Sequence, residues 1–199
     1  MMLIDEPAGP LAALRLDGFK AHLRLGTGFS DGDVQDVVLE SFLRAAIAAI
    51  EARTGKILIE RLLSWTLTRW RDEAGQTLPV APVKRIVSVK LRDRADDEEL
   101  IEASAYRLEA DNQRPVLRPN TARLPVVPMG GVVEITFEAG FAVDWIGLPS
   151  DLGHAVILLA ASYYENRDAT QLSGTAMPHA VAALIERYRT VRLLAGGRS

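Results

Sequence analysis

The spacing of apolar residues along this chain changes twice, from a helical period to a strand period and back again. From Val34 to Ala49, apolar side chains recur every three or four positions, which is typical of one face of an amphipathic helix. Between about residues 57 and 140 they alternate with polar side chains, as in strands with one solvated face. A helical period returns after Pro149. The pattern therefore predicts an α+β fold: a helical bundle formed by N- and C-terminal helices, with a small antiparallel β-sheet inserted between them.

The first third of the chain is predicted to be helical. A short helix over about residues 14–25 precedes a long one, for which Ser30 is suitably placed as the N-cap. Gly55 is expected to end the long helix, because glycine adopts the left-handed conformation after a helix without a steric clash. We therefore expect one compact unit with an N-terminal helical part (residues 1–55), an inserted β-sheet region (residues 56–141) and a C-terminal helical part with a basic tail (residues 142–199).

Four runs of alternating residues are expected to form the strands, and turn-forming clusters of proline and glycine separate them. The runs are residues 63–67, 87–92, 106–109 and 133–138. An acidic run lies between two of these strands. It comprises Asp93, Asp96, Asp97, Glu98 and Glu99. Like charges in succession repel one another and point into solvent, so this run is predicted to be the solvated tip of a hairpin.

The helix expected over about residues 151–167 is apolar on both of its faces. One face carries Leu152, Ala155, Val156, Leu159, Ala160 and Tyr163, and the other carries Ile157, Leu158, Ala161 and Tyr164. A helix that is apolar all round must be covered on all sides. Two explanations stay open: the chain wraps the helix in its own core, or a second protein molecule covers part of it. Under the second explanation the inter-subunit contact candidates are Ile157, Leu158, Tyr163, Tyr164 and Arg167.

The last predicted helix begins at Pro178 and leads into a basic C-terminus with four arginines. These are Arg187, Arg189, Arg192 and Arg198. One explanation is the favourable interaction of cations with the C-terminal end of a helix. The other is a surface that faces an acidic partner or a DNA backbone. A second basic group, Arg114, Arg118 and Arg123, lies in a proline-containing segment of the β-sheet region.

The sequence lacks the residues of most classes of catalytic site. The chain has no cysteine, and its three histidines lack the spacing of a zinc site, so neither thiolate chemistry nor a histidine metal centre is expected. The acidic run is the only carboxylate cluster, and a metal-dependent nuclease is the enzymatic alternative that it raises. The solvated hairpin tip is the better interpretation. We expect a protein that is not an enzyme and that has no cofactor and no metal.

The bulk properties point to a soluble, intracellular protein. Of its 199 residues, 48% are hydrophobic and 25% are charged, and the net charge is −3, which argues against a dedicated nucleic-acid-binding protein. The N-terminus lacks the features of a signal peptide. The apolar run over residues 155–161 is much shorter than the ~20 residues that span a bilayer, so no membrane partner is expected.

A series of short motifs carries a resemblance to a known family. The motifs are Thr54-Gly-Lys56, Leu78-Pro79, Pro82-Val83, the run from Val133 to Phe141, Pro149-Ser-Asp-Leu152 and Tyr164-Glu-Asn-Arg-Asp168. In this order and spacing the chain resembles the head-to-tail adaptor (connector) family of long-tailed phages, and it is especially similar to the adaptors of phage-like gene transfer agents. The resemblance covers about residues 14–194. It departs from the family pattern in residues 93–100, which contain no glycine.

The resemblance implies a structural role in a bacteriophage-like virion or a gene-transfer-agent particle. Such adaptors form a ring, usually of twelve copies, under the portal protein, where they extend the DNA channel and provide the platform for the stopper and tail. A C-terminal segment typically inserts into the portal. The portal-anchor candidates are therefore Arg187, Arg189, Arg192, Leu193 and Leu194.

The partners implied by the resemblance are the portal protein, a stopper or tail-completion protein and further copies of the chain. Double-stranded DNA would pass through the channel without sequence specificity, and the particle would assemble in the bacterial cytoplasm. Another neck component, a stopper or tail-completion protein, remains the alternative.

Overall fold

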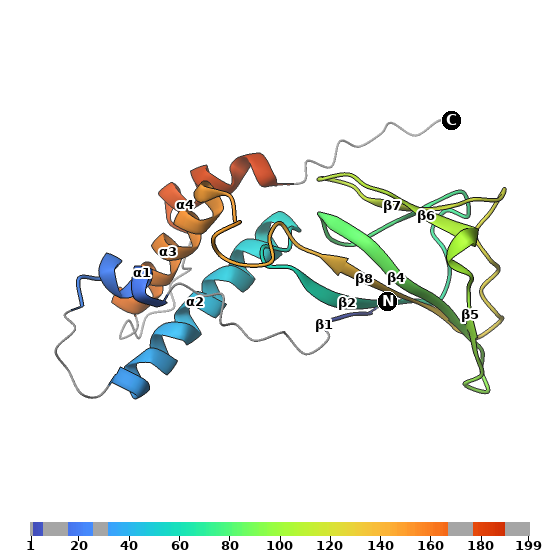
Figure 1. Cartoon of the computed structure of the whole chain (residues 1–199), viewed down its shortest axis with the longest axis horizontal. Helices are drawn as coiled ribbons and strands as arrows, with labels where there is room; N and C mark the ends of the chain where they lie inside the picture. Colours follow the sequence, from blue (N-terminus) through green and yellow to red (C-terminus); the bar gives the residue numbers. More distant parts are fainter. Residues whose placement is uncertain (1, 6–15, 26–31, 167–176, 190–199) are drawn as a thin grey trace.

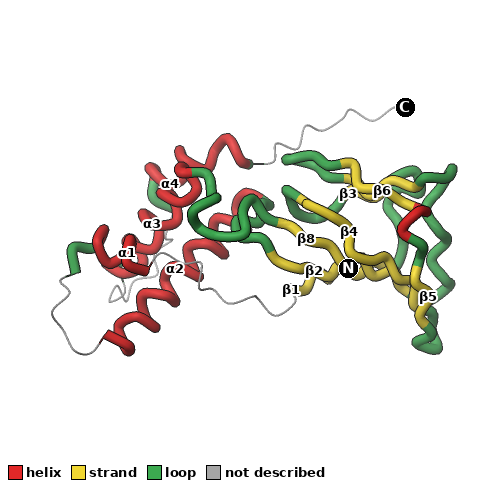
Figure 2. The backbone as a smooth tube through the Cα atoms, viewed as in Figure 1, coloured by secondary structure: helices red, strands yellow, loops and turns green. Residues whose placement is uncertain are grey.

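A computed structural model of the chain describes residues 2–5, 16–25, 32–166 and 177–189. The helices gather at one end of the molecule and the strands at the other (Figures 1 and 2). This arrangement confirms the predicted α+β class. Each end has its own apolar core. Within the described ranges, no helix combines the length and hydropathy that crossing a bilayer requires.

The helical end is built from segments at both ends of the chain, as predicted. Its elements are α1 (Leu16–His22), α2 (Gly32–Thr54), α3 (Ser150–Glu165), α4 (His179–Ile185) and the 3₁₀ turn η3 (Glu186–Tyr188). The apolar face of α2 packs against α3, and α3 in turn packs against α4. The core residues Leu43, Ile50 and Leu152 are almost completely buried. Gly55 ends α2 with a φ of +70°, which confirms the expected end. The expected cap Ser30 lies outside the described residues.

The strands form two antiparallel sheets, whereas the sequence pattern predicted one. The larger sheet has the order β1 (Met2–Asp5), β2 (Arg61–Leu67), β8 (Val132–Ala139), β4 (Val83–Arg92) and β5 (Glu98–Leu100). The smaller sheet has the order β3 (Gln76–Thr77), β7 (Val116–Pro119) and β6 (Tyr106–Glu109), and the 3₁₀ turn η2 (Ala103–Ala105) precedes β6. Buried and half-buried residues alternate along the whole of β8. The buried set on β8 includes Val133, Ile135 and Phe137, which form the centre of the second core.

The position of the acidic run was only partly predicted. Asp93, Asp96 and Asp97 lie at the hairpin tip, but Glu98 and Glu99 belong to strand β5. The strand extends this far because its residues pair with β4, with Glu98 opposite Arg92 and Glu99 opposite Leu91. The opposite charges of Glu98 and Arg92 stabilise a register that a run of carboxylates alone would disfavour.

The junction between the helical and β ends contains two shielded polar groups. The carboxylate of Glu51, near the end of α2, accepts the amide of Leu58 at 2.7 Å and both terminal guanidinium nitrogens of Arg61 at 2.9 and 2.8 Å. The side chains of Glu51 and Arg61 are only 10% and 19% exposed. Such a bidentate pair fixes orientation as well as distance.

Lys56 joins the same junction to the smaller sheet. Its side chain is almost completely buried, and Nζ donates hydrogen bonds to the carbonyl of Asn112 at 2.7 Å and to Oε1 of Gln113 at 2.8 Å. Burial lowers the pKa of Lys56, and the nearby carboxylate of Asp111 partly opposes this shift. The loop between β6 and β7 is therefore attached to the end of α2.

Replacing Glu51 by glutamine (E51Q) is expected to lower the free energy of unfolding by about 2 kcal/mol, because the guanidinium of Arg61 loses its charged partner in a shielded position. Urea unfolding followed by circular dichroism would measure the change. E40Q is the matched control on the same helix, since Glu40 pairs with Arg44 at the surface and its loss should cost less than ~0.5 kcal/mol. Equal losses in the two variants would contradict the assignment of the junction.

Candidate docking surfaces

The last described turn of the chain is attached to the fold by Tyr188. Its ring packs edge to face on Phe141, with 5.6 Å between centroids, and its hydroxyl donates a hydrogen bond to Oδ1 of Asp151 at 2.7 Å. Only 7% of Tyr188 is exposed. Burial and the hydrogen bond with Asp151 raise the pKa of the Tyr188 hydroxyl. The chain after residue 188 therefore leaves from a fixed point.

Two of the five portal-anchor candidates lie beside this point. Arg187 forms an ion pair with Asp151 at 3.1 Å and stacks over the Tyr188 ring at 4.8 Å, yet 71% of its side chain stays exposed. Arg189 pairs with Glu186 at 3.0 Å and is 45% exposed. The remaining candidates, Arg192, Leu193 and Leu194, lie outside the described residues. Each of the two described arginines is therefore paired with a carboxylate, although Arg187 stays largely exposed.

The chain's own helices partly cover the inter-subunit candidates on α3. Ile157 and Leu158 are half-buried and pack against the helical core. Tyr164 contacts Phe42 of α2 edge to face at 6.1 Å, and Tyr163 is also half-buried. Arg167 lies outside the described residues. The wrapped-core explanation thus accounts for much of this helix, and a half-buried remainder is left for another molecule to cover.

A pocket of about 460 Å³ lies beside these residues, between α2, α3 and the start of α4. Its apolar lining includes Ala49, Leu159 and Met177. Its polar lining includes Arg53 and Tyr163. A mixed lining of this kind suits a protein side chain at least as well as a small molecule.

Asp151 has a structural function in the first turn of α3. Pro149 occupies the N-cap position without a side-chain hydrogen bond. Asp151 accepts the adjacent amide of Leu152 at 2.9 Å while it binds Tyr188 and Arg187.

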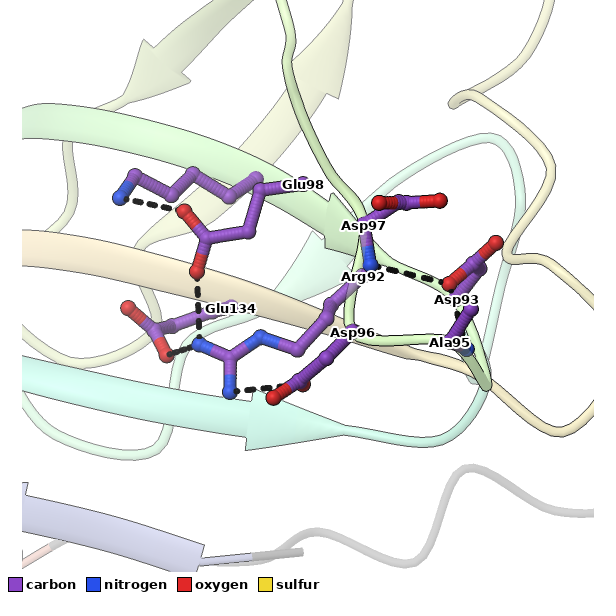
Figure 3. A network of polar contacts seen from close by, with 8 residues as sticks. Arg92, Asp93, Ala95, Asp96, Asp97, Glu98 and Glu134 are labelled. Carbon is purple, nitrogen blue, oxygen red and sulfur yellow. Dashed lines mark hydrogen bonds and ion pairs between the residues drawn. The ribbon is translucent and has the colours of Figure 1, made fainter.

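The β4–β5 hairpin places its charged groups in a network centred on Arg92 (Figure 3). The guanidinium of Arg92 contacts Glu98 at 2.9 Å, Glu134 at 3.5 Å and Asp96 at 3.6 Å. Lys90 forms a second pair with Glu98 at 3.1 Å. Hydrogen bonding and charge attraction from Lys90 lower the pKa of the Glu98 carboxyl, to which Arg92 also contributes. This carboxylate is therefore ionised and paired.

The hairpin tip uses Asp93 as a structural residue. Its Oδ1 accepts the amides of Ala95 at 2.7 Å and Asp97 at 3.1 Å, which closes the turn (Figure 3). Asp96 adopts a φ of +71°, a left-handed conformation that glycine would adopt more readily. Among the described residues, no three histidine or carboxylate side chains converge as a metal site would require. The geometry therefore gives the nuclease alternative no support.

Two arginines of the second basic group form ion pairs. Arg118 pairs with Glu109 at 2.7 Å across the β6–β7 strands, and Arg123 pairs with Glu73 at 3.1 Å. Arg114 is exposed in the loop before β7. The charges of Arg118 and Arg123 are therefore balanced by carboxylates of the same chain.

One exposed apolar loop was not predicted as a functional site. In the loop before β8, Val126 and Met129 are 86% and 92% exposed, the two highest values among the large apolar side chains that the structure describes. In the sequence these residues are surrounded by Pro125, Pro128 and Gly130, which predict a turn. One signal could have revealed them: large apolar residues occur here in a predicted turn, where the sequence does not alternate between apolar and polar residues as it does in a strand.

Solved structures that match this chain over the whole length of both chains include the following three. The neck of an empty gene transfer agent (GTA) particle with C6 symmetry contains a chain with 51% identity and a TM-score of 0.89. The virion of a native GTA particle gives 51% and 0.86, and the neck of a native GTA particle with C12 symmetry gives 47% and 0.85. Coverage is 100% of each chain in every case. No family model and no curated protein matches the chain.

Replacing Tyr188 by phenylalanine (Y188F) should lower the free energy of unfolding by about 1 kcal/mol at neutral pH, because it removes the hydrogen bond to Asp151 and keeps the ring. Since the pKa of Tyr188 is raised in the folded state, this stabilisation is present below the ordinary tyrosine pKa of about 10 and disappears as the pH rises through the folded value. Denaturant unfolding at pH 7 and at pH values above 10 would measure both effects. Y163F is the control, with a change below ~0.5 kcal/mol. A Y188F difference that grows with pH would overturn the assignment.

Proposed function

Because this chain belongs to the neck proteins of gene transfer agent particles, with 47–51% identity over its full length, we propose that it is the head-to-tail adaptor of such a particle. In this role it forms a ring under the portal protein, extends the DNA channel and provides the platform for the stopper and tail. The observation that carries the proposal is the full-length match to a neck structure at a TM-score of 0.89. It is a structural role rather than an enzymatic one.

The symmetry of the related assemblies supports self-association into a ring. Two of the matching neck structures have C6 and C12 symmetry, and twelve copies satisfy both. We propose that neighbouring copies meet along α3, with Ile157, Leu158, Tyr163, Tyr164 and Arg167 at or near the contact. The half-buried side chains and the adjacent pocket leave apolar surface for a neighbour to cover. Tyrosine and arginine are also enriched at the centres of protein interfaces.

The C-terminal segment is the proposed portal anchor. Arg187, Arg189, Arg192, Leu193 and Leu194 would bind the portal, the arginines through acidic groups and the leucines through apolar contacts. The exposed guanidinium of Arg187 beside a buried Tyr188 supports this proposal, because the segment starts from a rigid base and loses less entropy when it docks.

The proposed contact with double-stranded DNA is weak and independent of sequence. A strongly basic wall would hold the phosphate backbone and slow its passage, since phosphate contacts dominate affinity. The chain instead has a net charge of −3, and on the outer face of the larger sheet Arg92 and Arg85 pair with Glu134 and Glu138. Such a surface suits a channel that DNA traverses. Assembly in the bacterial cytoplasm is part of the same proposal.

A stopper or tail-completion protein is the alternative function within the same neck. The two functions differ in the neighbour that the C-terminus binds, because only the adaptor docks directly on the portal. Cross-linking of residue 192 to the portal protein in assembled particles would distinguish them.

Deleting residues 190–199 should abolish docking on the portal while the fold stays intact, because the contacts that Tyr188 and Arg189 make with the described residues are retained. Expected results are wild-type unfolding and loss of the protein from purified heads by at least tenfold, measured by quantitative mass spectrometry. The control replaces the same ten residues by a glycine–serine segment of equal length, which should fail to dock in the same way. Wild-type amounts of either variant on heads would contradict the anchor assignment.

A further inference from the structure

The loop of residues 125–131, here called the distal loop, presents apolar side chains at the end of the β region away from the helices. Val126 and Met129 lie in this loop with 86% and 92% of their surface exposed. The loop leads directly into β8, beside the β4–β5 hairpin at the far end of the molecule (Figure 1). Val126 and Met129 gain nothing from folding while they stay in water, so their burial against a partner would be favourable.

Tight packing holds the distal loop in place. The indole Nε1 of Trp70 donates a hydrogen bond to the carbonyl of Pro125 at 2.6 Å, and the amide of Gly131 donates one to the carbonyl of Pro128 at 2.9 Å. Gly131 lies so close to the backbone of β4 that a side chain there would clash with the carbonyl oxygen of Arg92. The two apolar side chains are thus presented from a fixed base, which limits the entropy lost on binding.

The hairpin tip beside the distal loop carries more carboxylates than cations, although Arg94, which contacts the loop, is a cation. Gly130 packs on the side chain of Arg94, so the loop adjoins the hairpin tip. At that tip Asp96 keeps 81% of its side chain exposed, and Asp97 and Glu99 are exposed as well. The surface therefore combines an apolar centre, Val126 and Met129, with a negatively charged border. Its complement is an apolar pocket bordered by lysine or arginine side chains.

We propose that the distal loop and the hairpin tip form the docking surface for a second neck protein, one that offers such a basic-bordered apolar pocket on the side of the ring away from the head. The inference rests on the proposed adaptor function. It states what kind of partner surface would bind a region that lies outside the C-terminal anchor and α3. A second copy of this chain is a poorer occupant, because side-by-side copies in a ring bring equivalent acidic ends near one another, where they repel.

The test uses particles in which every copy of this chain carries both V126D and M129D. Both side chains are exposed, so the variant should unfold like the wild type. We expect it to bind heads and to form rings of normal size. The amount of the next neck protein on purified heads should fall at least tenfold, measured by quantitative mass spectrometry, with tail-less heads in electron micrographs. The matched control is V143D with I146D, at 76% and 80% exposure in the loop before α3, which should retain tails.

A second variant, D96K with D97K, tests the charge complement without touching the apolar residues. It should weaken the same contact and reduce its dependence on salt concentration, because the attraction between opposite charges is lost. Together the two variants keep the proposal testable if one of them fails to fold.

Three outcomes would overturn the inference. Normal tails with V126D/M129D would show that the surface is not used, and a changed ring size would assign it to a second copy. Loss of the variant from heads would assign it to the head side. The 190–199 deletion distinguishes failure of the adaptor function from failure of this inference. If the adaptor function is wrong, the deletion variant remains on heads, while the distal-loop variant is still defective in its contact with the next neck protein.

Discussion

The shielded ion pair between Glu51 and Arg61 is the constraint on which the arrangement of this molecule depends. It lies where the long helix α2 ends and the chain enters the first long strand, and its carboxylate also holds the amide of Leu58. Without it, Gly55 would leave a flexible connection between two separate apolar cores. With it, and with Lys56 bound to the β6–β7 loop, the helical and β ends keep one relative orientation. The docking surfaces proposed for the two ends would need that fixed geometry.

Much of the fold follows from local sequence patterns. The period of α2, the glycine at its end and the strict alternation of β8 are signals carried by a few neighbouring residues, so they could be predicted. Two of the short strands, β1 at the edge of the larger sheet and β7 in the middle of the smaller one, could not be predicted in this way. Strand β1 has only four residues, and β7 ends in Pro119, so neither has enough alternating positions to stand out from a loop. The division into two sheets also depends on pairing between distant segments, which no local period encodes.

The candidate surfaces follow the same division between local and long-range information. The basic C-terminus and the apolar character of α3 are visible in the sequence. The fixing of Tyr188 by Asp151 is not, because the two residues are 37 positions apart. Likewise the sequence alone presents Glu98 as one of several acidic residues in a predicted loop. In the structure its side chain pairs with two cations of the neighbouring strand. Val126 and Met129 were missed because prolines and glycines dominate their surroundings.

The attachment of Tyr188 also has a mechanical consequence. If the C-terminal segment anchors the protein as proposed, a force on that segment would be transmitted to residue 188. The seven-residue helix α4 alone would unwind under such a load. Force applied at Tyr188 must instead withdraw an aromatic ring from Phe141 and break its bond to Asp151 at the first turn of α3. The load would therefore pass to α3, the longer helix in the centre of the bundle.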